Sequence, residues 1–273
     1  MADAGPSEDA PFHHYSRKQR AIAWISQNLF DSFTYTVRHG LLKGMKRKGG
    51  LGWLPASFSP GVSTAEHRFW SALDLAGLTV YDIGAFHGLL TLLFASRAKT
   101  VVAFEPNTQN RKRLMENLEL NSVRNVMVRD TGIGSRRENR TMVASPLMPG
   151  FASVDEHAPR PAGAAVKEEI AIVTLDEAIA DANLPAPDFI KIDIEGWELE
   201  ALRGARATLE RCRPSLFLEM HGETIAEKKR KVAGIVAYLW ELQYGRILHI
   251  ETETVITPDN SSLAMQGHLY CRS

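Results

Sequence analysis

The stretch VYDIGAFHG, residues 80–88, places an acid, two glycines and a histidine directly after an apolar run. In an open α/β sheet the first strand ends in a glycine-rich turn, and ligands bind beyond the carboxyl ends of the strands. Gly84 and Gly88 fit such a turn, and Asp82 stands at the end of the strand. The stretch therefore predicts the first strand and the ligand-binding turn of a parallel α/β sheet.

Beyond this turn, apolar runs alternate with helical patterns, as is typical of parallel βαβ units. Strands are predicted at residues 79–83, 100–104, 125–129, 188–194, 215–220, 246–250 and 263–270. Helices are predicted at residues 89–97, 108–120, 197–209 and 223–242. The predicted fold is therefore α/β, with a seven-stranded, mostly parallel sheet that carries helices on both faces.

The chain before residue 78 is predicted to be a helical extension. Residues 1–15 are polar and rich in Pro, Gly and Ala, which is typical of a disordered terminus. Within residues 16–77, a helical stripe is predicted from the spacing of Ile22, Ile25, Leu29, Phe33 and Val37. A second helix is predicted from Ser63 to Ala76, because Glu66 follows Ser63 at the capping-box spacing. These helices are expected to cover the acceptor pocket or to join two copies in a homodimer.

One long segment inside the α/β region lacks any regular pattern. Residues 145–169 follow neither the helical nor the strand period. The segment is longer than a structureless connection normally is inside a compact domain. We therefore expect a lid-like loop at residues 145–169.

Charge and composition exclude several classes of protein. Lys plus Arg and Asp plus Glu number 32 each, which gives no overall bias toward nucleic acid or an anionic membrane. No apolar run approaches the roughly 18 residues of a membrane span, and no signal-peptide pattern is visible. Cys212 and Cys271 are too few for a zinc cage or a disulfide framework, which favours a reducing compartment. We therefore expect a cytoplasmic protein that has neither nucleic acid nor membrane as its partner.

A second acid narrows the choice of ligand. Glu105 follows Gly84 by 21 residues, the place where an acid accepts hydrogen bonds from ribose hydroxyls in nucleotide-binding folds. A dinucleotide also needs a glycine where the backbone touches the diphosphate, and Phe86 and His87 occupy that part of the turn. The carboxylate of Asp82 would repel a diphosphate but attract a ligand with ammonium and sulfonium charges. The turn therefore favours S-adenosylmethionine over a nicotinamide dinucleotide.

The predicted contacts of this cofactor come from successive strand ends. Asp130 follows the third strand, where its carboxylate is expected to meet the amino group of adenine. The full set of predicted cofactor contacts is Asp82, Gly84, Ala85, His87, Gly88, Glu105, Pro106, Asn107, Asp130, Thr131 and Asp193.

Five motifs together resemble one known family. They are VYDIGAFHG (80–88), VVAFEPN (101–107), TLDEAI (174–179), DFIKIDIEGWELEALRG (188–204) and PSLFLEMHGE (214–223). In these motifs the chain resembles the FkbM family of S-adenosylmethionine-dependent methyltransferases. The resemblance implies a class I methyltransferase (Rossmann-like) domain over residues 78–273, with S-adenosylmethionine as cofactor and S-adenosylhomocysteine as product. It also implies methyl transfer to a hydroxyl of a carbohydrate, polyketide or related small metabolite.

The fourth and fifth predicted strands carry charges at buried positions. Side chains alternate across a strand, so Lys191 and Asp193 share one face of the fourth strand, as Glu219 and His221 do in the fifth. A central parallel strand is covered on both faces, and an unpaired charge there costs several kcal/mol. If the two strands are neighbours, we expect Lys191 to pair with Glu219 and Asp193 to approach His221.

Methyl transfer to a sugar hydroxyl requires an in-line approach and a base, because the hydroxyl is a weak nucleophile. His221, at the carboxyl end of a strand, is the predicted catalytic base. Asp193 is predicted either to orient His221 or to take the proton itself. Ser153, His157 and Glu195 are the predicted acceptor contacts, and His157 is the rival base.

Several alternatives remain open at this stage. Asp193, Glu195, Glu219 and His221 combine oxygen and nitrogen ligands that suit magnesium or manganese. Lys191 would compete for the same carboxylates, so the sequence predicts no metal. Other activities are a nicotinamide-dependent oxidoreductase on a Rossmann-like fold and a methyltransferase with an amine or RNA acceptor. The last alternative is a binding or assembly protein without turnover.

Overall fold

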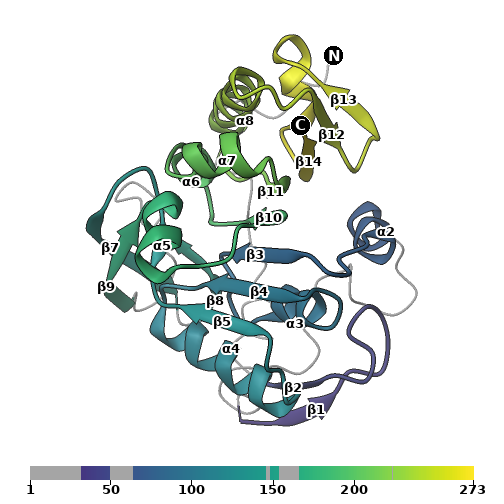
Figure 1. The fold of residues 1–273 in the computed structure, drawn as a ribbon, viewed down its shortest axis with the longest axis vertical. Coiled ribbons are helices and arrows are strands. Elements are labelled where there is room, and N and C mark those ends of the chain that lie inside the picture. Colours follow the sequence, from purple (N-terminus) through teal and green to yellow (C-terminus); the bar gives the residue numbers. More distant parts are fainter. Residues whose placement is uncertain (1–31, 50–63, 146–147, 154–165, 223) are drawn as a thin grey trace, which may run out of the picture.

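A computed structural model describes residues 32–49, 64–145, 148–153, 166–222 and 224–273 of the chain (Figure 1). Its centre is an eight-stranded sheet with the order β13-β12-β14-β11-β10-β3-β4-β5. These strands are β3 (Thr79–Ile83), β4 (Thr100–Phe104), β5 (Val126–Arg129), β10 (Phe189–Ile192), β11 (Ser215–Glu219), β12 (Arg246–His249), β13 (Thr254–Ile256) and β14 (His268–Arg272). The strands from β11 to β5 are parallel, and β14, β12 and β13 pair with their neighbours in antiparallel fashion. The predicted α/β fold with a mostly parallel sheet is confirmed.

All seven predicted strands are present, and β13 is an additional edge strand. The last strand begins at His268 rather than at Leu263, because Leu263 belongs to a 3₁₀ helix, η2 (Pro258–Ala264). Pro258 opens this helix, and Thr257 and Asn260 form its capping box. The apolar residues at the end of η2 made the predicted strand too long, because they belong to this helix and do not pair in the sheet.

Helices cover both faces of the sheet, as predicted. They are α2 (Ala65–Ala72), α3 (Leu89–Ala95), α4 (Thr108–Leu120), α5 (Leu175–Ala182), α6 (Glu198–Arg203), α7 (Arg206–Cys212) and α8 (Ile225–Glu241). The helix predicted at residues 197–209 is two helices, which meet at Gly204 and Ala205. Helix α5 was missed, and it begins with a capping box between Thr174 and Glu177. No helix within the described ranges is both long and apolar enough to cross a bilayer.

The start of α2 differs from the sequence prediction. Thr64 is its N-cap, and the Thr64 hydroxyl accepts the His67 backbone N–H at 3.0 Å. Glu66 accepts a hydrogen bond from the Trp70 indole at 3.0 Å, one helical turn further on. The capping box predicted between Ser63 and Glu66 is therefore wrong.

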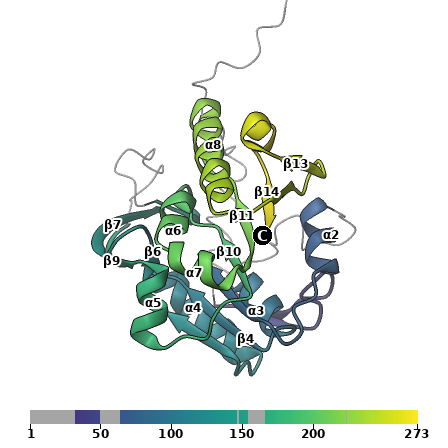
Figure 2. The same ribbon diagram turned by 45° about the horizontal axis from the view of Figure 1, so that its top comes forward.

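The core has two layers, one on each face of the sheet. Ile190 of β10 belongs to a cluster with apolar residues of α5, α6, α7 and α8. The preceding residue, Phe189, belongs to a second cluster with α2, α3 and α4. In that second cluster Trp70 lies 4.2 Å from Phe217 between ring centroids. Figure 2 shows α8 beside α6 and away from α2. Burial on both faces explains why the central strands are nearly continuous apolar runs.

A second, smaller sheet includes part of the segment that the sequence predicts as a loop at residues 145–169. Its order is β6-β9-β7-β8, from β6 (Gly132–Ile133), β7 (Glu138–Ser145), β8 (Met148–Ser153) and β9 (Val166–Val173). The prediction of a patternless lid is therefore wrong for β8 and for the first residues of β9. Ile170 and Ile172 are buried while Ala171 between them is exposed, so the strand period begins only late in β9. Residues 154–165 lie outside the described part of the chain.

The described part of the N-terminal extension is a β-hairpin rather than a helix. Strand β1 (Thr34–Thr36) pairs with β2 (Lys46–Lys48) in antiparallel fashion. Gly40 and Gly44 between them have φ of 74° and 89°, a left-handed backbone that ends a right-handed helix. The helical stripe predicted through Phe33 and Val37 is therefore wrong at those two residues. Its earlier residues lie outside the described ranges, so the disordered terminus and the helical dimer contact remain predictions.

Two asparagines of α4 hold the hairpin against the α/β domain. The Asn117 side chain accepts the Lys48 N–H at 2.8 Å and donates to the His87 carbonyl at 2.8 Å. Asn121 accepts the Lys46 N–H at 2.8 Å and donates to the Lys46 carbonyl at 2.7 Å. Asn117 is fully buried, whereas the Asn121 contacts are exposed. Asn117 therefore links the hairpin to the glycine turn at residues 84–88.

We predict that Asn117→Ala lowers the free energy of unfolding by about 2–4 kcal/mol, because it leaves a buried N–H and a buried carbonyl without partners. Asn121→Ala is the matched control and is expected to cost about 1 kcal/mol, since water replaces its exposed hydrogen bonds. Urea unfolding of both variants measures the difference. Equal losses would contradict the assigned link.

Candidate active site

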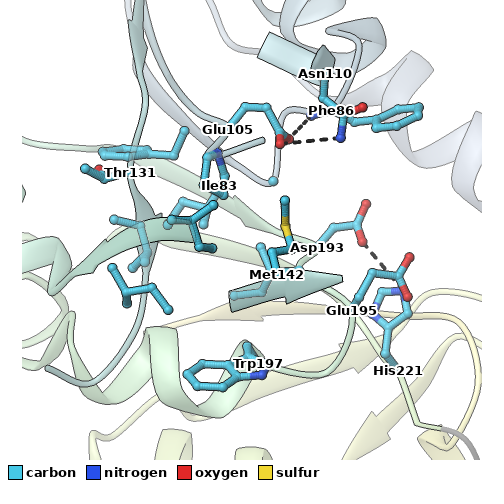
Figure 3. A pocket seen from close by; sticks show the side chains of 18 of the residues that line it. Ile83, Phe86, Glu105, Asn110, Thr131, Met142, Asp193, Glu195, Trp197 and His221 are labelled. Carbon is cyan, nitrogen blue, oxygen red and sulfur yellow. Dashed lines mark hydrogen bonds and ion pairs between the residues drawn. The ribbon is translucent and has the colours of Figure 1, made fainter. Parts of the chain in front are cut away.

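A cleft of about 270 Å³ opens at the carboxyl ends of β3, β4, β10 and β11, and the small sheet supplies a further wall. Some residues that line it were predicted from the sequence: Gly84, Glu105, Pro106, Thr131, Asp193, Glu195 and His221. The others are Ile83, Phe86, Phe104, Asn110, Gly132, Ile133, Met142, Ile170, Ile172, Ile194, Trp197 and Glu219. Figure 3 shows Glu195 and His221 at one side of the cleft and Thr131 at the other. One end is therefore acidic, and the other end is mostly apolar.

The glycine turn brings β3 and β10 close together. Gly84 has a φ of 82°, and a side chain there would overlap the carbonyl oxygen of Asp193. The N–H groups of Gly84 and Ala85 both donate to the Phe104 carbonyl at 3.0 Å. Gly88, with a φ of 83°, leaves room for the Leu114 side chain of α4. Both glycines are thus required by the backbone path of the turn and by its close neighbours.

Glu105 is held rigidly at the end of β4. Its carboxylate accepts the Phe86 N–H at 2.8 Å and the Asn107 N–H at 3.0 Å. Burial raises the pKa of Glu105, and the hydrogen bonds from Asn107 and Phe86 oppose that shift. Oε1 also accepts the Asn110 side-chain amide at 3.5 Å, whereas Oε2 accepts only the Phe86 N–H among the described residues and so has a second lone pair for a ligand in the cleft.

Lys191 is buried between two carboxylates. Its Nζ lies 3.2 Å from Asp82 Oδ1 and 3.4 Å from Asp193 Oδ2, and it donates to the Gly84 carbonyl at 2.7 Å. Burial works against the charged form of Lys191, but Asp82 and then Asp193 raise its pKa. In the sheet register Lys191 lies opposite Asp82 on one side and Phe217 on the other. The predicted pair between Lys191 and Glu219 is therefore wrong, because Phe217 rather than Glu219 occupies the neighbouring position.

Asp82 lies behind the cleft rather than in it. It is 0 % exposed, and its other oxygen accepts the Thr91 hydroxyl at 2.6 Å. Asp82 is absent from the residues that line the cleft in the described part of the chain. The direct cofactor contact predicted for Asp82 is thus replaced by a structural contact with Lys191.

His221 lies among four carboxylates at the acidic end. Its Nδ1 is 2.9 Å from Glu198 Oε1, and Glu198 is 1 % exposed. Its Nε2 lies 3.6 Å from Asp193 Oδ1 and 3.7 Å from oxygens of both Glu195 and Glu219. The predicted approach of Asp193 to His221 is confirmed.

The acidic cluster shifts the protonation of its members. Burial opposes the charge on His221, but Glu198, Glu195 and Asp193 raise its pKa to about 10. Burial, with Asp193 and Glu219 nearby, raises the pKa of Glu195 to about 8, although His221 opposes the shift. The pKa of Asp193 is lowered: burial opposes the charge, but Lys191 and His221 outweigh it. With these neighbours the pKa of His221 favours its protonated form at neutral pH, and its role as the catalytic base stays a prediction.

The remaining predicted cofactor contacts are not on the cleft surface. Ala85 and Gly88 are buried in the turn, and Asn107 caps α4 and donates to Glu168. Asp130 is exposed beyond β5. Ala85, Gly88, Asn107 and Asp130 are therefore near the cleft but do not line it.

His87 also points away from the cleft. Its ring stacks on Phe86 at 3.8 Å between centroids. Burial, followed by the nearby charges of Arg113 and Arg47, lowers the pKa of His87 to about 3, and a hydrogen bond with Asn110 opposes the shift. His87 is therefore a neutral packing residue beneath the hairpin. Of the predicted acceptor contacts, His157 lies outside the described residues, and for Ser153 the structure describes only the pairing of β8 with Val143.

A family model for the methyltransferase FkbM domain matches residues 82–245 of the chain. The chain belongs to the FkbM methyltransferase family. The match begins in β3, before the glycine turn, and includes Glu105, Asp193, Glu219 and His221, so the family region contains the whole acidic end of the cleft.

Two curated relatives match this FkbM chain over part of their length. Methyltransferase 1 of Beauveria bassiana is 26 % identical over 144 residues, which are 46 % of this chain and 57 % of that protein. Hexuronic acid methyltransferase AglP of Haloferax volcanii is 28 % identical over 131 residues, which are 48 % of this chain and 51 % of that protein. The chain therefore spans little more than half of the length of each relative.

A solved structure supports the fold of the FkbM chain. Methyltransferase FkbM from Methylobacillus flagellatus superposes with a TM-score of 0.50 at 21 % identity, and the likeness covers 80 % of this chain and 48 % of that one. The sheet order and this likeness identify a class I, Rossmann-like methyltransferase fold.

Sequence reasoning missed most of the apolar side of this FkbM cleft. Met142, Ile170 and Ile172 come from the small sheet, and nothing in their spacing indicated that it folds back onto β3 and β4. Trp197 stands inside a recognised motif, but only the structure shows that its side chain faces the cleft. Glu219 was placed in a pair and in a metal cluster, and its position on the same strand face as His221 was the signal for a site residue.

We predict that Gly84→Ala loses at least about 3 kcal/mol of stability and also loses binding of S-adenosylhomocysteine, because the new methyl group overlaps Asp193 at the cleft edge. Gly77→Ala is the matched control. Its φ of 79° imposes the same left-handed strain of about 1 kcal/mol, but no atom lies within 4 Å of the new methyl group. Urea unfolding and calorimetry compare the two variants, and similar losses in both would contradict the close-approach argument.

We predict that His87 makes the fold sensitive to acid. Its folded pKa of about 3 lies below the ordinary value of 6.5, so the unfolded chain binds more protons between these values and stability falls as pH drops below about 6.5. One proton accounts for at most about 1.4 kcal/mol per pH unit. His87→Gln should remove this part of the slope in urea unfolding between pH 7.5 and 5. Parallel pH profiles of the two proteins would contradict the assignment.

Proposed function

We propose that the chain transfers the methyl group of S-adenosylmethionine to a hydroxyl of a small metabolite, with a carbohydrate as the favoured acceptor class. The observation that carries the proposal is the charge distribution of the cleft. Carboxylates of Glu105, Asp193, Glu195 and Glu219 line it, and no Lys or Arg is among its described lining residues. Such a cleft attracts a cationic ligand and repels a diphosphate.

The two ends of the cleft match the two ends of this cofactor. Apolar side chains such as Phe104, Ile133 and Ile172 offer a slot for the flat adenine ring near Thr131. Glu105, at the end of β4, is in place to accept hydrogen bonds from the ribose hydroxyls. The sulfonium and ammonium charges would then lie toward Asp193 and the acidic cluster. This orientation places the transferable methyl group near His221 and Glu195.

The proposed reaction is a single in-line displacement. The acceptor oxygen forms a bond to the methyl carbon, the bond from carbon to sulfur breaks, and its electron pair stays on sulfur in S-adenosylhomocysteine. The hydroxyl proton passes to the carboxylate cluster. His221 lies 3.6 Å from Asp193 and 3.7 Å from Glu195 and attracts both side chains, and Glu195 would contact the acceptor hydroxyl. Because carboxylates crowd this end, a neutral hydroxyl is a better acceptor there than an acidic group.

The carbohydrate class is supported by one relative. The Haloferax volcanii protein that matches about half of this chain is a hexuronic acid methyltransferase. A nicotinamide-dependent oxidoreductase is disfavoured because its diphosphate would face Asp193, Glu195 and Glu219. Amine and RNA acceptors are outcomes that the same acceptor assay distinguishes.

The function is tested by incubating the protein with S-adenosylmethionine labelled in its methyl group and with separate acceptors. The set comprises hexoses, hexuronic acids and their glycosides, a polyketide alcohol, an amino sugar and RNA. The expected product is an O-methylated sugar identified by mass spectrometry. Calorimetry with S-adenosylhomocysteine and with NADH is run in parallel, and binding of NADH alone would overturn the proposal.

We predict that Glu105→Gln weakens binding of S-adenosylhomocysteine about 10- to 100-fold, because a charged acceptor of ribose hydrogen bonds is lost. Glu119→Gln, on the exposed surface of α4, is the matched control and should bind like the parent protein. Isothermal titration calorimetry measures both affinities. An unchanged affinity of the Glu105 variant would refute the proposed position of the ribose.

A further inference from the structure

We infer that Asp193, Glu219 and His221 form a binding site for one divalent cation of the magnesium or manganese class. The role that we assign to the cation, to hold the acceptor hydroxyl beside the sulfonium methyl, rests on the proposed function. The site itself rests on the geometry of the three side chains. It replaces the metal-free prediction made from the sequence.

The three residues offer their ligand atoms to a common point. One oxygen of Asp193, one oxygen of Glu219 and one ring nitrogen of His221 all lie within 4.8 Å of one another. His221 Nε2 is 3.6 Å from Asp193 Oδ1 and 3.7 Å from Glu219 Oε1. Around one octahedral cation with bonds of about 2.1 Å, neighbouring ligand atoms lie about 3.0 Å apart and opposite ones about 4.2 Å apart. The two separations from His221 Nε2 lie between these values, so the site is completed by movement of the side chains toward a common cation.

Each of the three side chains is held from behind by an outer partner. Glu198 occupies Nδ1 of His221 at 2.9 Å, which directs Nε2 toward the carboxylates. A carboxylate on the second ring nitrogen is the arrangement that orients most metal-binding histidines. The other oxygen of Glu219, Oε2, faces His268 Nε2 at 3.7 Å, and the Nδ1 of His268 lies 2.6 Å from Glu251. The atoms left facing inward are those that a cation needs.

Lys191 does not compete for the inner atoms. It contacts Oδ2 of Asp193 at 3.4 Å and Asp82 at 3.2 Å, whereas Oδ1 of Asp193 faces His221. Lys191 therefore acts as the outer partner of Asp193, in the same sense as Glu198 for His221. The sequence argument against a metal was that Lys191 would compete for these carboxylates, but its contact with Asp193 is made through Oδ2 rather than through Oδ1.

Charge and chemistry select the kind of cation. Two carboxylates and one imidazole form a mixed oxygen and nitrogen set without sulfur, which suits magnesium or manganese better than soft metals. Glu195 and Glu198 add two more carboxyl groups within 3.7 Å of the imidazole nitrogens. The free coordination positions face the cleft, where an acceptor hydroxyl bound to the cation becomes more acidic. His221 would coordinate the cation through a deprotonated Nε2, and the cation would activate the acceptor hydroxyl.

The test is titration of the chelator-treated full chain with manganese chloride, with free Mn²⁺ followed by its paramagnetic resonance signal. We expect saturable binding of about one Mn²⁺ per chain. Glu219→Gln and His221→Asn should each weaken binding at least about 10-fold, and Glu198→Gln about 10- to 100-fold through loss of the outer contact. Asp181→Asn removes an exposed acid of α5 and is the matched control with unchanged affinity. Circular dichroism confirms that each variant is folded.

Failure of the cation site and failure of the methyltransferase proposal give different results. The cation site alone is overturned if the protein binds S-adenosylhomocysteine in chelator but takes up no Mn²⁺. It is also overturned if the Glu219 variant takes up as much Mn²⁺ as the parent protein. Mn²⁺ uptake that depends on Glu219, without binding of S-adenosylhomocysteine, supports the site and overturns the methyltransferase proposal. When both ligands bind, methyl transfer that is lost in chelator and restored by magnesium supports the assigned role, and transfer that is undiminished in chelator overturns that role.

Discussion

The cleft depends on one buried ammonium group. Lys191 lies in the central strand β10, and its charge is compensated by Asp82 on β3 and by Asp193 at its own strand end. Removal of one partner of such a group leaves an uncompensated buried charge, which is strongly destabilising. Lys191 also donates to the carbonyl of Gly84, so the same ammonium sets the distance between the glycine turn and β10. This contact, together with the pairing of β3 and β10, positions the glycine turn relative to the acidic cluster.

Charge compensation of Lys191 explains why Asp82 and Asp193 have different roles. Asp82 neutralises the ammonium from a position with no exposure and leaves Asp193 with one oxygen for the ammonium and one for the cleft. Beyond Asp193 the chain turns through Glu195 and Gly196, whose φ values of 54° and 101° reverse its direction. This turn brings the Glu195 side chain to within 3.7 Å of Nε2 of His221. It also leads into α6, from which Glu198 contacts the other ring nitrogen, Nδ1. Three acids of one short segment, Asp193, Glu195 and Glu198, thus surround a histidine that follows the neighbouring strand.

Periodicity predicts the main sheet because its central strands are buried on both faces and therefore appear as short apolar runs. It also predicts that Asp193 and His221 share an edge, since both follow strand ends. Periodicity does not determine which residues lie opposite each other, because a shift by two positions keeps every side chain on the same face. That ambiguity led to the pair between Lys191 and Glu219, whereas the register places Phe217 beside Lys191. The hairpin was missed because its strands have only three residues each. The small sheet was missed because charged residues interrupt the apolar pattern of its long strands β7 and β9.

The small sheet differs from the main sheet in how it can change. Its strands pair only with one another, so substitutions in β7, β8 or β9 leave the register of β3, β10 and β11 intact. It nevertheless reaches the cleft through Met142, Ile170 and Ile172. Residues at such a wall can alter the shape offered to a ligand without disturbing Lys191 or the acids that it holds. The main sheet therefore supplies the acidic side chains of the cleft, and the small sheet supplies one of its apolar walls. Substitutions in that wall can change which ligands fit while the acidic side chains stay in place.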